Sequence, residues 1–315
     1  MSTLTQELNR YLTVRRALGY KLSTSARILH RFAAFAESKG ANHITTHLFL
    51  EWQKSFGRAH RATWGARLGM IRNFARWLHA LDSRNEVPPQ GLIPYGHRRV
   101  RPYIYSQQEI QSIVHAAATL PSIYGFRALT ISTFIGLVAA TGLRISEAIS
   151  LDVADVDLGL GILRIRRGKL GKERFVPVSE STKARLADYA SERHRLWGGD
   201  QESFFLSERG TRLTDCSVRY NFAVVCKRIG LRPPQRYHKH GRGPRIHDLR
   251  HTFAVQTLLG WYRSGKDAAA EMLKLTTYLG HAHPIHTYWY IEAVPELLEL
   301  ASQRAIKSLS KEDRV

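Results

Sequence analysis

Residues 140–151 read ATGLRISEAISL, and this stretch organises the second half of the chain. A mostly apolar segment ends at a glycine, Arg144 follows from the turn, and a new amphipathic segment begins. Farther along come the basic segment RIRRGKLGKERFVPV (164–178), then HDLRH (247–251) and LGHAHPIHTYWY (279–290). In this order the four segments supply guanidiniums, an ammonium, imidazoles and a phenol. Together these groups can attack a phosphodiester without a metal ion.

Outward from these segments, apolar residues recur mainly at helical spacing. Ser106 followed by Glu109 forms a capping box that predicts a helix start. One hairpin interrupts the helices, with GILRIRR (161–167) and RFVPV (174–178) flanking a glycine-containing turn. The pattern predicts a mainly α protein with a small β-hairpin or sheet. The expected helices cover residues 3–17, 23–38, 63–81, 107–119, 126–140, 146–151, 180–196, 214–230, 247–264, 268–278 and 293–308, with one more from a cap at Thr45 or Thr46 through Phe56.

The amino-acid composition indicates a globular protein with a negatively charged partner. The chain has 315 residues, of which 43% are hydrophobic, so it can build a core and divide into two or three domains. Lys and Arg number 47 against 26 Asp and Glu, a net charge of +21. Such an excess favours a polyanion such as nucleic acid as partner, although a merely soluble basic protein would share it.

Two cysteines, Cys216 and Cys226, fall on one predicted helix. A separation of ten residues places them about 15 Å apart along the axis, too far for a disulfide. We expect both to be buried thiols in a reducing compartment. No secretory signal or transmembrane run is recognisable, so the expected location is the cytoplasm, in association with nucleoid DNA.

The first 100 residues are the most basic part of the chain. They hold 16 Lys and Arg against 5 Asp and Glu, a net of +11, while the other 215 residues carry +10. We expect a DNA-facing helix here, although a solvated helix face is the alternative reading. A proline-containing, basic segment follows, which either tracks a DNA backbone or only connects two lobes. The candidate DNA contacts in the two segments are Arg61, Arg67, Arg72, Arg76, Arg98, Arg99 and Arg101.

The chemistry of phosphoryl transfer assigns several residues directly. Arg144 and Arg250 can each donate paired hydrogen bonds to nonbridging oxygens and stabilise the charge of the transition state. His247 lies three residues before Arg250, so both face the same side of a helix. Glu147 lies three residues after Arg144 and can hold that guanidinium by a hydrogen bond.

These segments resemble the tyrosine recombinases of the phage integrase family. The resemblance rests on motifs over residues 104–308, and over residues 1–82 it rests only on helix content and basicity. The resemblance implies a helical core-binding domain (1–82), a linker (83–104) and a mixed α/β catalytic domain of the DNA breaking-rejoining type (105–315). It implies a site-specific recombinase or integrase that works through a 3′-phosphotyrosine. The implied catalytic residues are Arg144, Lys169, His247, Arg250, His281 and Tyr290.

Further implied roles follow from the same resemblance. His247 takes or returns the tyrosine proton, Lys169 protonates the leaving 5′ oxygen, and His281 donates to the phosphate. Lys172 is the alternative to Lys169, and Tyr288 is the alternative to Tyr290. The family position of His251 is usually structural, which leaves this residue outside the site. Phosphate contacts are expected from the hairpin residues Arg166 and Arg167.

Departures from the common family pattern, such as Trp289 and the longer segment before the LGH motif, indicate a subgroup tied to mobile elements. No cofactor and no metal are expected, although the histidine-rich segments 238–247 and 281–286 could be taken for a metal site. A type IB topoisomerase and a catalytically decayed DNA-binding accessory protein remain alternatives. The expected partners are double-stranded DNA and three more copies in a tetramer, with sister recombinases as a further option. The helix 293–308 should pack on a neighbouring copy or, alternatively, on its own domain.

Overall fold

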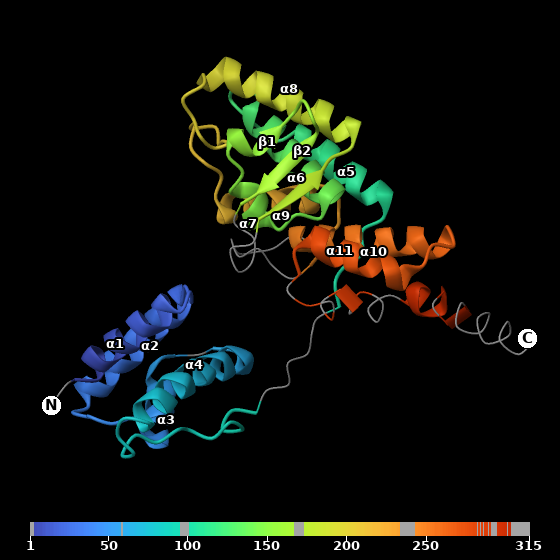
Figure 1. Ribbon diagram of the computed structural model, residues 1–315. Helices are drawn as coiled ribbons and strands as arrows, with labels where there is room; N and C mark the ends of the chain where they lie inside the picture. The colour runs from blue at the N-terminus through green and yellow to red at the C-terminus, as the bar shows by residue number, and fades with distance from the viewer. Residues whose placement is uncertain are drawn as a thin grey trace, which may run out of the picture. The chain divides into compact units, whose positions relative to one another are not determined.

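The computed structural model describes residues 3–57, 59–94, 101–166, 173–233 and 243–281, then positions 283, 285, 287, 288, 290, 295–300, 302 and 303. The chain divides into two compact units, Met1–Val100 and Arg101–Val315. Each unit is built mainly of helices, and the second also holds a small antiparallel sheet (Figure 1). The predicted fold class is therefore confirmed.

Unit 1 is helical throughout its described elements. Thr3 caps the first helix in a capping box, and the Thr45 hydroxyl accepts from the backbone N–H of Leu48, which identifies Thr45 as the cap of the third helix. The fourth helix begins two residues earlier than predicted because His60 Nδ1 accepts from the N–H of Ala62. The helices are α1 (Leu4–Ala17), α2 (Ser23–Ser38), α3 (Thr46–Ser55) and α4 (Arg61–His79).

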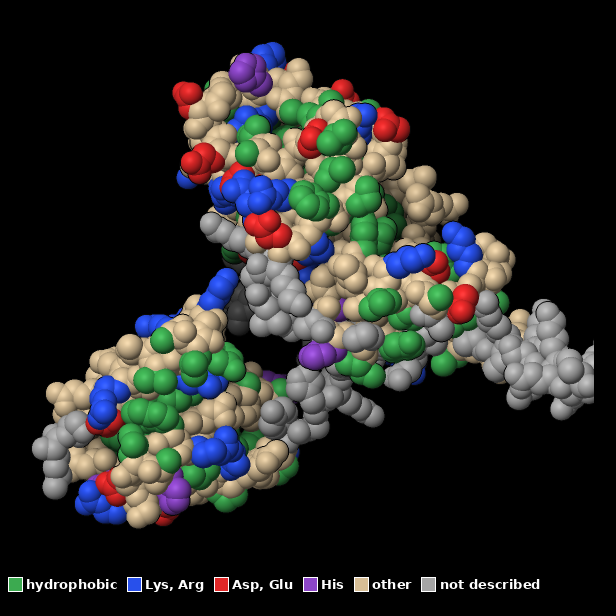
Figure 2. All heavy atoms as spheres, in the orientation of Figure 1, with side chains coloured by type: hydrophobic (Ala, Val, Ile, Leu, Met, Phe, Trp, Pro, Cys, Tyr) green, Lys and Arg blue, Asp and Glu red, His purple; other side chains and the backbone are tan. Residues whose placement is uncertain are grey.

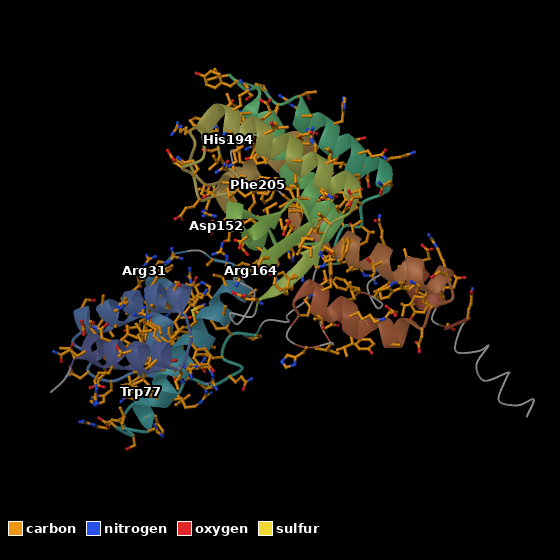
Figure 3. The ribbon with its side chains drawn as sticks, turned by 45° about the horizontal axis from the view of Figure 1, so that its top comes forward. Arg31, Trp77, Asp152, Arg164, His194 and Phe205 are labelled. Carbon is orange, nitrogen blue, oxygen red and sulfur yellow. The ribbon has the colours of Figure 1, made fainter. Side chains whose placement is uncertain are left out.

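Unit 2 is organised around one helix, α6, whose buried residues lie on all of its faces. Helices α5, α8 and α10 pack against it. The predicted capping box of Ser106 and Glu109 is present at the start of α5. Phe205, labelled in Figure 3, fills the core beside Phe134 and Tyr189, at ring-centroid distances of 5.2 and 5.1 Å. The helices are α5 (Gln107–Ala118), α6 (Phe126–Thr141), α7 (Ile145–Ile149), α8 (Glu180–Trp197), α9 (Asp215–Arg228), α10 (Ile246–Arg263) and α11 (Ala268–Leu279).

The sheet of unit 2 has three antiparallel strands in the order β1-β2-β3. Strands β2 (Ile162–Ile165) and β3 (Arg174–Pro177) form the predicted hairpin, in which Ile165 lies opposite Arg174. Strand β1 (Val156–Asp157) follows the short 3₁₀ helix η1 (Val153–Asp155) and was not predicted, because two residues are too few to show alternation. The hairpin turn, 167–172, lies outside the described residues.

The end of the described chain packs on unit 2 itself. Leu297 is fully buried in a cluster with Leu258 and Leu275, and Glu296 pairs with Arg263 of α10. This is the alternative that the sequence left open for the helix 293–308, whose Ala301 and Ile306 lie outside the described residues.

The expectation of two buried cysteines was wrong for one of them, because Cys216 is exposed while Cys226 is buried. Ten residues at 100° each fall about 80° short of three full turns, so the two side chains point about 80° apart and only Cys226 reaches the core. None of the helices in the described part of the chain combines the length and the apolar character that crossing a bilayer requires.

Candidate active site

Three arginines meet at the C-terminal end of α11. Arg174 Nε donates to Tyr278 O at 2.7 Å, Arg250 Nη2 to Leu279 O at 2.6 Å, and Arg144 Nη2 to Gly280 O at 2.9 Å. The last carbonyls of a helix lack partners within it and carry partial negative charge, so each is satisfied here by a cation. This end of α11 therefore gathers side chains from the α6–α7 turn, from β3 and from α10.

Arg250 is the most enclosed of the three. Its side chain is 2% exposed, and its Nη1 also donates to Gly142 O at 2.7 Å. Burial lowers its pKa to about 10, and the charge of Arg144 adds to this effect. Gly142 has φ +62, and a Cβ there would lie 2.6 Å from Phe253 Cδ1. The glycine of the ATGLR stretch is thus required both by its backbone angle and by the space left beside it.

Glu147 holds two of these arginines. Its carboxylate accepts from Arg144 Nη1 at 2.6 Å and from the Arg144 backbone N–H at 3.0 Å, as the sequence spacing predicted. It also accepts from Arg174 at 3.1 and 2.8 Å. Burial opposes ionisation, but the hydrogen bonds and charges of the two arginines lower the pKa of Glu147 to about 2. The carboxylate is therefore ionised at neutral pH and fixes both guanidiniums.

Tyr290 lies inside this group of residues. Its side chain is buried, and its ring centroid is 5.4 Å from that of His251 and 6.1 Å from that of His281. Burial raises the pKa of the phenol, while the charge and a hydrogen bond of Arg250 work in the opposite direction. Tyr288, the alternative nucleophile, is 42% exposed. The structure thus brings Tyr290, rather than Tyr288, to Arg250.

The two histidines of HDLRH lie together at the start of α10. The ring of His247 is 4.9 Å from that of His251, and burial, followed by the charge of Arg250, lowers the pKa of His247. Burial and then His247 lower the pKa of His251 to about 4. The sequence analysis left His251 outside the site, but residues four apart on a helix are neighbours. His251 contacts both His247 and Tyr290.

His281 follows directly after the turn at Gly280. Its Nδ1 lies 2.8 Å from Thr287 Oγ1, and Thr287 Oγ1 lies 3.0 Å from Thr276 Oγ1. Thr276 in turn donates to Met272 O within α11. This chain of hydroxyls connects the His281 ring to the helix, and no sequence pattern pointed to either threonine.

The structure describes only some of the other candidate residues. Lys169, its alternative Lys172, and Arg167 lie outside the described residues, as do Arg98 and Arg99. Arg101 is exposed. Arg166 pairs with the carboxylates of Asp155 and Asp152, which already occupy part of its guanidinium.

The arginines of α4 lie on the surface of unit 1. Arg61 and Arg76 are exposed, and Arg72 is half-buried. Arg67 stacks over Phe56 at 4.0 Å and over Trp64 at 4.5 Å. In Figure 2 the visible face of this unit shows many more basic than acidic side chains. Around α4 this surface offers positive charge to a polyanion.

Sequence reasoning missed Arg174 entirely. It stands two residues after Lys172 in GKERFVPV, where the strand alternation would have placed it on the inward side of the sheet. In the part of the chain that the structure describes, no three His, Cys, Asp or Glu side chains converge as metal ligands would. Three of the six histidines of 238–247 and 281–286, namely His238, His240 and His286, are not among those residues.

The chain is similar to known proteins in sequence and in fold. Residues 104–296 match the model of the phage integrase family. A protein described as an integrase/recombinase, y4rB of Sinorhizobium fredii, is 41% identical over 309 residues, 96% of this chain and 97% of that protein. The solved Tn1549 transposon integrase in complex with transposon right end DNA has a TM-score of 0.63 at 15% identity, covering 92% of this chain and 94% of that chain. A lambda integrase tetramer bound to a Holliday junction has a TM-score of 0.58 at 18% identity, covering 90% and 79%.

Proposed function

Because the chain belongs to the phage integrase family and is a tyrosine-type site-specific DNA recombinase, we propose that it cuts and rejoins DNA through Tyr290. The phenolic oxygen attacks the scissile phosphate, the bond from phosphorus to that oxygen forms, and the bond to the 5′ oxygen breaks. The strand is then held as a 3′-phosphotyrosine. A 5′ hydroxyl from a second strand reverses the step, so the transesterification needs no nucleotide to supply energy and no metal ion.

The position of Tyr290 against Arg250 carries this proposal. A free phenol has a pKa of about 10, so it needs nearby cations to react at neutral pH. Arg250 hydrogen-bonds to Tyr290, and Arg144 also acts on its pKa in the favourable direction. The same two cations would hold the scissile phosphate, so the nucleophile and its target share one binding place.

Arg144 and Arg250 would stabilise the phosphorane. Each terminal guanidinium nitrogen carries two hydrogens, and the contacts to Glu147, Gly280, Gly142 and Leu279 fix the planes of the two guanidiniums. Guanidiniums that are already oriented need no rearrangement as charge develops on the phosphate. Loss of one of them should cost roughly 10²–10³-fold in cleavage rate, as for other oriented donors.

The remaining roles concern protons. His247 would take and return the phenolic proton, since its lowered pKa leaves it neutral at pH 7 and able to accept. His281 would donate to the phosphate from a ring that Thr287 holds. Lys169, with Lys172 as the alternative, would protonate the departing 5′ oxygen.

The proposal extends to partners and setting. Residues 1–82 would bind DNA as a core-binding domain, 83–104 would link them to the catalytic domain 105–315, and four copies would act together. The solved lambda integrase tetramer on a Holliday junction supports such an assembly. The Tn1549 transposon integrase supports a role in moving a mobile element. We place the activity on nucleoid DNA in the cytoplasm, with sister recombinases as further partners.

A nicked suicide duplex tests the cleavage step. The substrate is a DNA duplex taken from the sequences that flank the gene, chosen because the protein protects it in footprinting. The duplex carries a nick, so that the short fragment released by cleavage diffuses away. In EDTA the wild-type chain should form a protease-sensitive covalent adduct, and Tyr290→Phe should bind the duplex equally well but form none. Tyr288→Phe is the matched control and should form the adduct normally.

Intact and supercoiled DNA carrying the same site, together with the nicked duplex, separate the alternative functions. A recombinase should exchange strands between two intact sites, whereas a type IB topoisomerase would relax supercoiled DNA without pairing sites. A DNA-binding accessory protein would form no adduct at all. An absolute need for magnesium in the single cleavage step would overturn the proposed chemistry.

A further inference from the structure

Arg174 of β3 contacts residues of the candidate active site as well as its neighbours in the sheet. Its side chain is 11% exposed, and all three guanidinium nitrogens are engaged inside the protein. Nε donates to Tyr278 O, and the two terminal nitrogens donate side by side to the Glu147 carboxylate. This paired geometry requires a guanidinium and cannot be reproduced by an ammonium. None of these contacts is to Tyr290, so Arg174 faces the supports of the site and not the nucleophile.

Arg174 and Arg144 divide the Glu147 carboxylate between them. Oε1 accepts from Arg144 Nη1 at 2.6 Å and from Arg174 Nη1 at 3.1 Å. Oε2 accepts from the Arg144 backbone N–H at 3.0 Å and from Arg174 Nη2 at 2.8 Å. Because Glu147 is buried, removal of Arg174 would leave each oxygen short of one donor. The Arg144 guanidinium could compensate only by moving from its present place.

A second, independent contact connects Arg174 to the turn that carries His281. Gly280 has φ +65, and a Cβ added there would lie 2.8 Å from Arg174 Nη1. The glycine therefore lets the arginine lie directly against the turn. Through Tyr278 O and Gly280, Arg174 fixes the backbone from which His281 projects, and Arg144 is bound to the same turn by Gly280 O.

We propose that Arg174 is a positioning residue for strand cleavage, which holds Glu147 and the end of α11 so that Arg144 and His281 face the scissile phosphate together. The inference rests on the proposed function and goes beyond it by assigning a role to a residue that does not touch the substrate. A misplacement of about 1 Å in a reacting group can cost roughly 10²-fold in rate, so loss of a residue that only holds the reacting groups in place should still slow cleavage.

The test compares Arg174→Ala and Arg174→Lys with Arg164→Ala. Arg164 lies on the neighbouring strand β2, is labelled in Figure 3, and pairs at 3.0 Å with the exposed Glu173. Its removal takes one positive charge from the same sheet without touching Glu147. Three quantities are measured for each variant, namely the melting temperature, the affinity for one half-site, and the single-turnover rate of adduct formation at saturating DNA.

Both Arg174 variants should form the adduct roughly 10–100-fold more slowly at saturating DNA, with half-site affinity within about twofold of wild type. Arg164→Ala should cleave at the wild-type rate. If the melting temperature of Arg174→Ala is too low for the cleavage assay, the test rests on the cleavage rate of Arg174→Lys, which keeps the charge and most of the side chain. Wild-type cleavage by a folded Arg174 variant would overturn the proposal.

A double-mutant cycle with Glu147→Gln separates positioning from general destabilisation. Because Arg174 acts through Glu147, adding Arg174→Ala to Glu147→Gln should slow cleavage by much less than Arg174→Ala does alone. If the two substitutions lowered the cleavage rate by fully additive free energies, Arg174 would not act through Glu147. If the wild-type chain itself forms no adduct, the proposed function fails first, whereas wild-type cleavage by the variants overturns only the role of Arg174.

Discussion

The arginines of α4 and the arginines at the end of α11 are used in opposite ways. Among the described residues, none of Arg61, Arg67, Arg72 and Arg76 pairs with a carboxylate, and Arg67 rests on aromatic rings. The three at the end of α11 each donate to a helix carbonyl, and two of them also share Glu147. Of the first set, Arg61, Arg72 and Arg76 are left available on a surface. The second set is fixed inside the protein before any substrate arrives.

The difference follows from the two tasks. Binding a DNA backbone needs charge at roughly the right place, and surface arginines supply it by releasing counterions from the duplex. Stabilising a pentavalent phosphate needs donors at fixed positions, and internal oxygens fix them. Acidic residues are distributed accordingly, with 5 in the first 100 residues and 21 in the remaining 215. Substitutions in the two regions should therefore change different measured quantities.

Apart from the loss of the nucleophile itself, the largest effect is expected from Lys169→Ala, which removes the proposed general acid. Cleavage of an ordinary duplex should fall roughly 10²–10⁴-fold, because the 5′ oxygen must leave as an alkoxide. A duplex with a bridging 5′ sulfur should be cut at nearly the wild-type rate, since a thiolate leaves without a proton. Equal losses on the two substrates would mean that Lys169 only positions DNA, and Lys172 would then be tested in the same assay.

Arg250→Ala should affect both cleavage and folding. The carbonyls of Gly142 and Leu279 would lose their buried donor, which costs roughly 1–3 kcal/mol each in the free energy of unfolding. Cleavage should fall roughly 10²–10³-fold at saturating DNA. Urea unfolding and single-turnover cleavage measure the two effects separately. A variant of normal stability would show that these carbonyls are satisfied in another way.

Substitutions in α4 should change binding and leave cleavage alone. Changing Arg61, Arg72 and Arg76 together to Ala should lower half-site affinity and reduce the log–log salt slope by about 0.9 for each phosphate that is no longer neutralised. Arg10→Ala is the control, because that exposed arginine is already paired with Glu7. The cleavage rate at saturating DNA should stay at the wild-type value. An unchanged salt slope would favour the reading of α4 as a solvated face.

The smallest effect concerns stability against pH. His251 has a pKa of about 4 in the folded chain against about 6.5 when unfolded, so the unfolded chain binds more protons between these values. Stability should therefore rise from pH 4 to pH 6.5, by at most about 3 kcal/mol, and then level off. His251→Asn should flatten that interval in a melting series. Glu147, with a pKa of about 2, contributes stability that is lost only as the pH falls below about 4.5.

Much of this arrangement could be predicted from the sequence, because several signals were local. Capping residues such as Thr45 and Ser106 marked helix starts, and the spacing from Arg144 to Glu147 predicted their hydrogen bond. Arg174 could not be found in this way, since its partners Glu147 and Tyr278 lie far away along the chain and meet it only through the fold. His251 could have been placed by its four-residue spacing from His247, and the assumption that the position is structural hid that relation.

The identity of the residue that carries the DNA tests the account most directly. The wild-type adduct would be formed on the nicked duplex in EDTA, digested with a protease, and the DNA-linked peptide sequenced by mass spectrometry. The account predicts a phosphotyrosine at Tyr290, on the side chain buried against Arg250. A linkage at Tyr288, at any other tyrosine, or at a serine would contradict it.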